Sequence, residues 1–371
     1  MTCFATNFFL TTGKFKHILQ KSQLKFKKMN YKFLGNTGVL VSELCFGTMT
    51  FGGVGYWSNM GKVGQDDATQ LIKVAVDGGI NFIDTANIYS YGESEILLGQ
   101  AIKSLGLNRQ DLFIASKLRG RMEATSRNNV GLSRLHIHRS VDESLQRLGM
   151  NHLDMLYIHG FDAYTPIEET MRGLNEMVQS GKVRYIAACN IPAWVFMKAN
   201  GIAEKNGWAK FDGMQYYYSI AGRDVEREVL PLAKSEKIGF MPWSPLAGGF
   251  LSGKYSRAIE KAGDSRRDVF DFPPVNKEKA YDIIDVMTEM AQNHDVSVAR
   301  IALAWVNQQS GVTSVIIGAK TAAQLEDNIA ASALRLSADE LSRLDTVSAL
   351  TKEYPQWMVE RQGSDRLLPS S

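Results

Sequence analysis

Four side chains that can hold or move a proton follow apolar, strand-like runs in the first half of the sequence. Asp84 ends one run, and Tyr89 comes five residues after it. Lys117 and His159 end the next two such runs. A carboxylate, a phenol, an ammonium and an imidazole at one site can carry out general acid–base chemistry. We therefore treat this quartet as the candidate catalytic set.

The chemistry that fits this quartet is reduction of a carbonyl group. Hydride arriving at the carbonyl carbon creates alkoxide character on the oxygen, which needs a proton as it forms. A free tyrosine has a pKa of about 10, which makes it a weak acid near neutral pH. We expect Lys117 to lower the pKa of Tyr89 and Asp84 to balance the buried ammonium. A neutral His159 can donate a hydrogen bond that orients the carbonyl.

Each of the four residues also has a structural explanation when taken alone. Tyr89 fits a surface-loop aromatic, and Asp84 fits a helix cap. Lys117 fits a solvated charge at a strand end, and His159 fits a hydrogen-bonded core histidine. Their joint occurrence after three consecutive strand-like runs favours the catalytic interpretation.

Eight β-rich runs alternate with amphipathic helical stretches and must position this quartet. The expected strands are Leu44–Gly47, Asn81–Asp84, Leu112–Lys117, Leu153–His159, Val183–Asn190, Gly213–Tyr216, Gly239–Trp243 and Ser314–Gly318. The clearest helical patterns are Asp67–Asp77, Glu93–Ser104, Ser133–Leu148 and Thr321–Ala331. Such alternation predicts an α/β fold, a (β/α)8 TIM barrel with its active site where the strands end.

The unit before Val183–Asn190 shows how local chemistry sets this pattern. Thr165 can cap a helix that begins with Pro166, and Glu168 would complete a capping box. An apolar stripe at helical spacing follows, formed by Met171, Leu174, Met177 and Val178. Gly181 then supplies a left-handed residue that stops the helix.

Two segments lie outside the repeat. Tyr31–Val41 predicts a β-hairpin that plugs one end of the barrel. Residues 247–276 predict a long, functional loop after the seventh strand. We expect residues 29–350 to form the barrel and residues 351–371 a C-terminal tail. Residues 1–28 are expected to be a disordered basic extension or to lie upstream of the true start.

The charge balance argues against nucleic acid as a partner. Residues 1–28 contain six of the 42 basic residues and no Asp or Glu, so residues 29–371 hold 36 basic and 39 acidic side chains. No apolar run reaches the length of a membrane span. Three scattered cysteines fit a reducing, cytoplasmic compartment. We expect a small-molecule carbonyl or alcohol substrate; the oligomeric state is left open.

Two motifs suggest other chemistry and are set aside. Gly248–Lys254 matches most of a phosphate-binding loop, but Tyr255 stands where Ser or Thr would hold magnesium. His136 and His138 have no third ligand at a convincing spacing, so we interpret them as solvated histidines. We therefore predict no metal site.

Longer stretches around the quartet resemble the signature of the aldo-keto reductase family. The resemblance covers residues 30–350 and is carried by Gly79–Tyr89, Gly92–Glu95, Ala115–Lys117, Leu153–His159 and Gly181–Ile186. It looks most similar to bacterial-type reductases related to potassium-channel β subunits, on the segments Trp243–Leu246 and Ile317–Lys320.

The resemblance implies NADPH or NADP+ extended across the barrel mouth. Asn190 and Gln215 would hold the nicotinamide carboxamide, with Trp243 stacked on the ring. The pyrophosphate loop would be formed by Ser244, Leu246, Gly248, Gly253 and Lys254. The adenosine and its 2′-phosphate would lie among Gly318, Lys320, Gln324, Asp327 and Asn328. Lys320 favours NADPH, because its cation can pair with the extra phosphate.

Two cofactor positions depart from the family pattern. Cys189 stands beside the nicotinamide where the family usually has serine, which weakens one carboxamide contact. Asp327 replaces a commoner glutamate, which loosens the adenine side.

Loops over the mouth should select the substrate. The expected pocket residues are Tyr56, Trp57, Tyr91, Met122, Phe161 and Tyr164, each of which could instead pack one loop on another. The resulting prediction is NADPH-dependent reduction of aldehydes or ketones with Tyr89 as general acid. A slow, redox-sensing NADPH-binding protein and a different barrel enzyme, such as a metal-dependent hydrolase or a phosphate-binding isomerase, are the alternatives.

Overall fold

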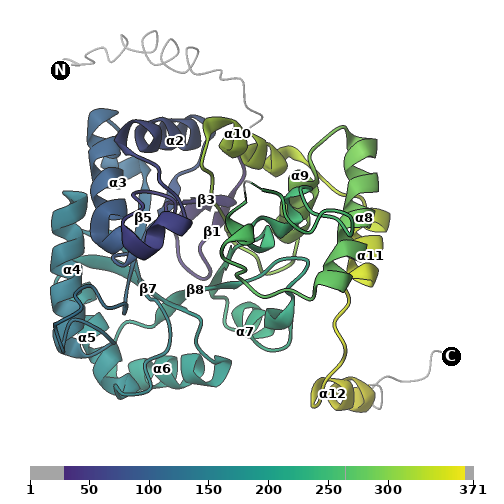
Figure 1. Ribbon diagram of the computed structural model, residues 1–371. Coiled ribbons are helices and arrows are strands. Elements are labelled where there is room, and N and C mark those ends of the chain that lie inside the picture. The colour runs from purple at the N-terminus through teal and green to yellow at the C-terminus, as the bar shows by residue number, and fades with distance from the viewer. Residues whose placement is uncertain (1–28, 264, 364–371) are drawn as a thin grey trace, which may run out of the picture.

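Parallel strands form the centre of the computed structural model, which describes residues 29–263 and 265–363 (Figure 1). The eight barrel strands in these ranges are β3 (Leu44–Gly47), β4 (Phe82–Asp84), β5 (Phe113–Leu118), β6 (Leu153–Ile158), β7 (Val183–Cys189), β8 (Phe211–Tyr217), β9 (Gly239–Trp243) and β10 (Val315–Ile317). They pair in the order β10-β3-β4-β5-β6-β7-β8-β9, with every pair parallel. The expected eight strands are therefore confirmed, with ends that differ by at most two residues.

The two outermost strands of this order meet and bring the sheet round into a barrel. Phe240 of β9 forms a parallel bridge with Val312, which lies just before β10. The Thr313 amide donates to the Phe240 carbonyl at 2.9 Å, and the Thr313 hydroxyl accepts from the Phe240 amide at 3.1 Å. The chain is thus a (β/α)8 TIM barrel, as predicted.

Helices surround the strands (Figure 1). They are α2 (Gln65–Asp77), α3 (Glu93–Ser104), α4 (Arg134–Leu148), α5 (Ile167–Gln179), α6 (Ala193–Asn206), α7 (Val229–Ser235), α8 (Lys277–His294), α9 (Val298–Asn307), α10 (Ala322–Ala330) and α11 (Ala338–Val347). A last helix, α12 (Gln356–Gly363), lies apart from the barrel within the range expected to be a tail (Figure 1).

Short 3-10 turns complete the connections. They are Gly55–Asn59, Tyr89–Gly92, Arg109–Asp111, Asp224–Glu226, Ala247–Ser252, Arg266–Asp268 and Ala331–Ala333. Two of them lie in the long loop between β9 and α8, which confirms the predicted long connection after the seventh barrel strand. The expectations for residues 1–28 lie outside the described residues, and the division at residue 350 stays a prediction.

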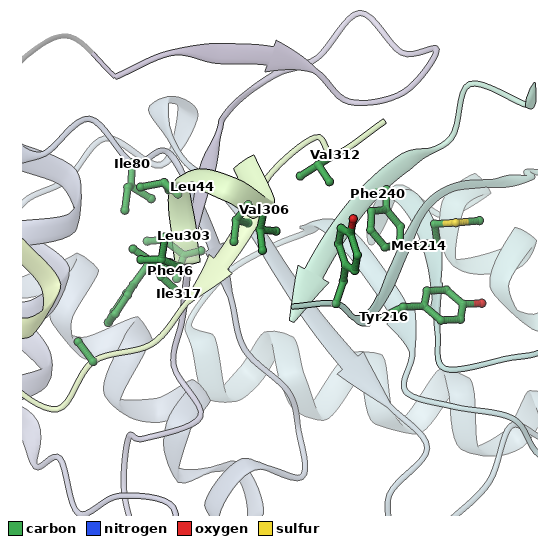
Figure 2. Packing of buried hydrophobic residues seen from close by; sticks show 14 of the residues in the cluster. Leu44, Phe46, Ile80, Met214, Tyr216, Phe240, Leu303, Val306, Val312 and Ile317 are labelled. Atoms are coloured by element: carbon green, nitrogen blue, oxygen red, sulfur yellow. The ribbon is translucent and has the colours of Figure 1, made fainter. Parts of the chain in front are cut away.

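Strand side chains alternate between two apolar layers. One layer fills the barrel interior and includes Cys45, Phe82 and Met155. The other lies between the strands and the helices, where Leu44, Phe46 and Ile317 gather near Leu303 (Figure 2). Full burial of a side chain such as Phe46 contributes about 1.5–3 kcal/mol. This two-sided burial explains why parallel barrel strands read as nearly continuous apolar runs.

The N-terminal hairpin closes the bottom of the barrel. Its strands β1 (Tyr31–Phe33) and β2 (Leu40–Ser42) pair antiparallel. Leu34, in the turn, belongs to the interior apolar layer, and a Cβ on Gly239 at the start of β9 would come within 2.6 Å of it. The hairpin therefore plugs the end of the barrel where the strands begin, as expected.

The expected cap of α5 is wrong. The helix begins at Ile167, and Pro166 occupies the capping position without a side-chain hydrogen bond. The Thr165 hydroxyl instead donates to Asp162 at 2.7 Å. A carboxylate is a strong acceptor, and Asp162 lies only three residues before Thr165. The hydroxyl therefore turns toward Asp162 instead of capping the helix. The apolar stripe of α5 and the left-handed Gly181 are as predicted.

The interpretation of the two α4 histidines as solvated is wrong for His136, whereas the side chain of His138 is 39% exposed. His136 is fully buried, and its ring lies 3.2–3.3 Å from the Ser140 hydroxyl one turn later. His138 is paired with Glu176 of α5 at 2.6 Å. The buried face of α4 thus includes His136 among its apolar residues.

The described helices contain no membrane-spanning candidate. None of those in residues 29–263 and 265–363 combines the length and the apolar character needed to cross a bilayer.

Candidate active site

Lys117 is the centre of the predicted quartet. It lies near the end of β5 and is fully buried inside the barrel mouth. Its ammonium donates to Asp84 Oδ1 through a short ion-paired hydrogen bond, to the Thr85 carbonyl at 2.8 Å, and to the Tyr89 hydroxyl at 3.2 Å. All three donor sites of the ammonium are therefore used. The structure thus brings three of the four predicted residues into one hydrogen-bonded cluster.

The local electrostatics keep Lys117 charged. Burial lowers the pKa of a lysine, but the Asp84 carboxylate and Tyr89 outweigh that effect, and the pKa of Lys117 lies well above its ordinary value. Burial raises the pKa of Asp84, while the Lys117 ammonium and the Gln215 amide oppose the rise. A buried ammonium without such a partner would lose its charge.

The pKa of Tyr89 differs from the sequence expectation. Burial raises it above the ordinary value, and the nearby Asp84 adds to the rise. Lys117 lowers it, as expected, but does not outweigh burial. The expected net lowering is wrong because the phenol is only 9% exposed and loses its hydration. Tyr89 therefore holds its proton at neutral pH, as a proton donor must.

His159 lies beside the Tyr89 hydroxyl cluster. Its ring centroid is 5.8 Å from that of Tyr89, in an edge-on arrangement. Burial, followed by the positive charges of Lys117 and Arg119, lowers the pKa of His159 to about 3. The ring is therefore neutral near pH 7, as expected for a hydrogen-bond donor that orients a carbonyl.

The loop after β4 holds Tyr89 in place. The Asn87 amide donates to the Lys117 carbonyl at 3.1 Å. Ser90 and Tyr91 adopt left-handed backbone conformations, and the Ser90 hydroxyl accepts from the Gly53 amide at 2.9 Å. The tight turn directs the phenol back over the end of β5.

Glu95, in the segment Gly92–Glu95, has a structural role. It is fully buried in α3, where it accepts from Ser116 at 2.5 Å and from Arg147 at 2.7 Å. Because Ser116 precedes Lys117, this contact fixes α3 and α4 to the strand that carries the ammonium.

Gln215 and Cys189 lie next to the quartet. The Gln215 amide donates to Asp84 Oδ2 at 2.9 Å. Cys189 is fully buried at the end of β7, and burial raises the pKa of its thiol. The thiol therefore lies protonated beneath the cluster at neutral pH.

Trp243 and Asn190 form the neighbouring part of the mouth. The Trp243 indole donates to Asn190 Oδ1 at 3.0 Å, and Asn190 has a left-handed backbone. The Trp243 ring packs against two other aromatic rings. Its centroid is 5.2 Å from that of Tyr217 and 5.8 Å from that of Phe272. Phe272 is the better stacked, at an interplanar angle of 15°.

A left-handed loop follows β9. Ser244, Ala247, Gly248 and Gly253 all have positive φ. The Ser244 hydroxyl accepts from the Gly248 amide at 2.9 Å, and the Leu246 carbonyl accepts from the Gly249 and Leu251 amides. A Cβ on Gly248 would lie 2.4 Å from the Phe272 carbonyl, so only glycine fits there. Lys254 is exposed just past this loop.

The remaining cofactor candidates cluster at the start of α10. Thr321 caps the helix, and the Lys320 amide donates to Gln324 at 2.9 Å. Asn328 donates to the Gly318 carbonyl at 3.2 Å. Asp327 instead pairs with Arg300 at 2.6 Å and accepts from Ser297 at 2.6 Å.

The expected pocket residues divide into two groups. Trp57 packs on Tyr89 with ring centroids 5.4 Å apart, and Tyr56 packs on Trp57 at 5.7 Å. The second group makes no ring contact with Tyr89 or His159 in the described part of the chain. It consists of Tyr91, Met122, Phe161 and Tyr164. Tyr164 is 98% exposed, so the structure does not bring its ring into a pocket.

The long loop contributes residues that the sequence reasoning missed. Phe270 packs on Tyr56 at 6.0 Å and on Phe272 at 5.6 Å. Together with the contacts above, these rings form a continuous arc from His159 to Tyr217 across the mouth. The loop is rich in glycine and arginine, and its two aromatic residues, Phe270 and Phe272, were the sequence feature that could have indicated this contribution.

Arg266 is a second residue of the long loop that the sequence did not indicate. Its guanidinium would lie 3.1 Å from a Cβ on Gly248, and its hydrogen bonds go to the Phe272 carbonyl at 3.5 Å and the Met60 sulfur at 3.8 Å. Burial and the neighbouring Arg267 lower its pKa. Within residues 29–263 and 265–363 it pairs with no carboxylate, whereas Arg267 pairs with Asp271 at 2.7 Å.

No metal centre is built from the described side chains. In the ranges that the structure covers, no three His, Cys, Asp or Glu residues are grouped closely enough to hold a metal ion.

Comparison with known proteins agrees with this architecture. A sequence model of the aldo/keto reductase family matches residues 43–349. The chain is 34% identical over 334 residues to versiconal hemiacetal acetate reductase of Aspergillus parasiticus, covering 85% of this chain and 96% of that protein. It is 33% identical over 328 residues to norsolorinic acid reductase of Aspergillus flavus, covering 86% and 81%. It is also 34% identical over 332 residues to an oxidoreductase of Bacillus subtilis, covering 86% and 96%.

The fold and the sequence match define the class of protein. The chain belongs to the aldo/keto reductase family. Its fold and its reductase-named relatives support an oxidoreductase that acts on small carbonyl compounds.

Proposed function

We propose that this protein reduces aldehydes or ketones to alcohols with NADPH, and that Tyr89 is the general acid. The observation that carries the proposal is the Lys117 ammonium, which contacts Asp84, the Thr85 carbonyl and the Tyr89 hydroxyl at once beside a neutral His159. The cofactor supplies the hydride.

The mouth has features that fit an anionic dinucleotide. The left-handed loop after β9 has no room for a side chain at Gly248, so its backbone can approach a ligand closely. Arg266 lies against this loop without a carboxylate partner in the described residues, and we assign it to the pyrophosphate. Lys320 precedes the capped N-terminus of α10, which suits the 2′-phosphate that distinguishes NADPH from NADH.

The nicotinamide end is assigned to residues near the quartet. Asn190 and Gln215 would hold its carboxamide, and Trp243 would face its ring. Gln215 would then serve two tasks, because its amide nitrogen already donates to Asp84. Ser244, Leu246, Gly253 and Lys254 would complete the pyrophosphate loop, with Gly318, Gln324 and Asn328 on the adenosine side.

In the proposed reaction, each residue of the quartet has one role. An N–H of neutral His159 donates a hydrogen bond to the substrate carbonyl and orients it. As negative charge develops on that oxygen, Tyr89 transfers its hydroxyl proton. The Lys117 ammonium, 3.2 Å away, stabilises the phenolate that remains. Asp84 holds the ammonium in this position and balances its charge.

A raised pKa at Tyr89 is compatible with this role. The acid must be protonated before transfer, and burial ensures that it is. The forming alkoxide is a stronger base than a phenolate, so the transfer is favourable once hydride has arrived.

We also propose that the protein is related to bacterial-type reductases and potassium-channel β subunits, on the basis of Trp243–Leu246 and Ile317–Lys320.

The test is NADPH consumption followed by absorbance, with 4-nitrobenzaldehyde as substrate. We expect wild-type protein to oxidise NADPH faster than NADH, and Tyr89→Phe to lose about two to four orders of magnitude in kcat. NADPH binding by Tyr89→Phe, measured by fluorescence, should be nearly unchanged. Tyr354→Phe, at a 74% exposed tyrosine near α12, is the matched control. A wild-type rate in Tyr89→Phe would overturn the assignment of the proton donor.

A further inference from the structure

A single arginine stands beside the quartet with its terminal nitrogens unused. Arg119 comes immediately after β5, two residues beyond Lys117, and its side chain is exposed at the mouth. Its Nε donates to the Phe161 carbonyl at 2.8 Å. Across the described ranges, no hydrogen bond or ion pair engages its two Nη groups. One edge of the guanidinium is therefore fixed while the other is free to bind.

The side chain lies along the backbone that carries His159. A Cβ on Gly160 would come within 3.5 Å of Arg119 Cδ and 3.6 Å of its Nε. The arginine side chain therefore lies within van der Waals range of the Gly160 backbone, next to His159. The positive charge of Arg119 is also one of the causes that lower the pKa of His159. The guanidinium is therefore close enough to His159 to affect whatever that ring holds.

The carboxylate that could neutralise Arg119 is occupied elsewhere. Asp162 accepts from the Leu132 amide at 2.8 Å, the Thr165 hydroxyl at 2.7 Å and the Tyr164 amide at 3.0 Å. Its oxygens serve the loop between β6 and α5, and it forms no ion pair with Arg119. The charge of Arg119 is one of the causes that lower the pKa of Asp162, but among the described residues no hydrogen bond or ion pair joins that carboxylate to the two Nη groups.

The backbone at Arg119 is held in an unusual conformation. Its φ is 148°, in a region that L-residues rarely adopt and that glycine accepts without strain. Strained residues of this kind gather at functional sites, where the surrounding structure holds them. A glycine would suit the chain at this point, yet an arginine is present. The surrounding structure therefore holds an arginine here at a cost in backbone strain.

We infer that Arg119 binds an anionic group of the substrate, and that this protein prefers carbonyl compounds bearing a carboxylate. The inference rests on the proposed function and adds the chemical class of its substrate. A planar guanidinium with one edge anchored and the Nη edge open matches the two oxygens of a carboxylate. The substrate carbonyl lies at His159 while its carboxylate pairs with Arg119.

The test compares two aldehydes that differ in charge. 4-Formylbenzoate and its methyl ester share the ring and the aldehyde, and only the first carries a carboxylate. For each variant, kcat/KM is measured for both, and the acid-to-ester ratio is compared with that of wild type, which cancels their different intrinsic reactivity. We expect the ratio to fall about 10-fold or more in Arg119→Gly and Arg119→Ala, mainly through KM for the acid.

Three further variants or conditions separate binding from a structural role. Arg119→Lys keeps the charge but loses the fork, so it should retain part of the acid preference. Arg121→Ala removes a neighbouring exposed arginine, bonded to the Ser126 carbonyl at 2.5 Å, and should leave the ratio unchanged. Added salt should raise KM for the acid but not for the ester in wild type.

Different failures are distinguishable. If wild type reduces both aldehydes and the acid-to-ester ratio is unchanged in Arg119→Gly and Arg119→Ala, the inference is overturned while the proposed function stands. If both variants lose the acid and the ester equally, Arg119 only supports the loops, which also overturns it. If wild type reduces neither aldehyde with NADPH, the proposed function fails and the inference fails with it.

Discussion

Gln215 and Asp84 lie 131 residues apart in the sequence and are joined across the barrel interior by a 2.9 Å hydrogen bond. The Gln215 amide nitrogen donates to one carboxylate oxygen, which leaves the other for the Lys117 ammonium. The carboxylate is thereby held between two donors from β8 and β5. The charge state of the whole cluster depends on this arrangement.

A carboxylate in place of the Gln215 amide should make folding pH-dependent. Gln215→Glu puts a second buried acid against Asp84, and two adjacent carboxylates cannot both ionise without cost. We expect the free energy of unfolding to fall by about 1–3 kcal/mol at pH 7. The deficit should shrink at pH 5, because one proton shared by the pair restores a donor. Urea unfolding at both pH values measures it.

Gln215→Leu is the control for that substitution. It removes the hydrogen bond but adds no titrating group, so its deficit should be similar at pH 5 and pH 7. A deficit for Gln215→Glu that does not depend on pH would contradict the proposed proximity of the two charges.

Removal of Lys117 alone should lower the free energy of unfolding more than removal of both members of its ion pair with Asp84. Lys117→Met leaves the buried Asp84 carboxylate without its cation, which we expect to cost about 3–5 kcal/mol of unfolding free energy. Adding Asp84→Asn removes the uncompensated charge, so the double variant should be more stable than Lys117→Met alone. Denaturant unfolding of the two single variants and the double variant gives the coupling energy. Strictly additive effects would argue against a charged pair in the folded state.

The sequence was sufficient to locate the strands and the four quartet residues. Parallel barrel strands are buried on both sides, so Leu153–Ile158 and its neighbours form apolar runs that stand out from the helices. Because strand ends meet at one mouth, Asp84, Lys117 and His159 could be grouped before any coordinates were considered. Tyr89 followed from its short distance in sequence from Asp84.

The features that the sequence did not predict depend on contacts between distant segments. The net pKa of Tyr89 is set by burial under the mouth loops, which residue spacing does not report. Arg266 and Phe272 acquire meaning only because their long loop folds back onto Gly248 and Trp243. The Thr165 hydroxyl had two possible partners, and local pattern could not show that it donates to Asp162 rather than accepting from a backbone amide. His136 looked solvated because a helix face cannot be assigned from one histidine.

Asp212 should destabilise the folded protein at neutral pH. It lies half-buried near the start of β8, where burial raises its pKa to about 6 despite the charge of Lys210. The folded state therefore binds this proton more tightly than the unfolded state, and stability falls as pH rises from about 4 to about 6. Asp212→Asn should raise the unfolding free energy by about 1–3 kcal/mol at pH 7, with little gain at pH 4.

Thermal and urea unfolding of Asp212→Asn at pH 4 and pH 7 check this prediction. Asp67→Asn, at an exposed position in the first turn of α2, is the control and should bring no gain at either pH. A gain for Asp212→Asn that is equal at both pH values would show that the carboxylate charge is not its cause.

His136 should make the protein less stable in acid. It is fully buried in α4, and burial, followed by the charge of Arg139, lowers its pKa to about 4. An unfolded histidine binds a proton below about pH 6.5, whereas the folded one resists until about pH 4. Between these values the unfolded state binds more protons, so stability is lost as pH falls, by at most about 1.4 kcal/mol for each pH unit.

The variant His136→Leu should remove this part of the acid sensitivity. The free energy of unfolding, measured in urea at half-unit steps from pH 5 to pH 7, should then change less steeply with pH than in wild type. His159 has a pKa lowered to about 3 and acts with the same sign, so the slope should decrease rather than vanish. If His136→Leu and wild type lost stability in parallel below pH 6.5, the buried imidazole would have to be titrating freely. That outcome could not be reconciled with a ring that has no exposed surface and that lies 3.2–3.3 Å from the Ser140 hydroxyl.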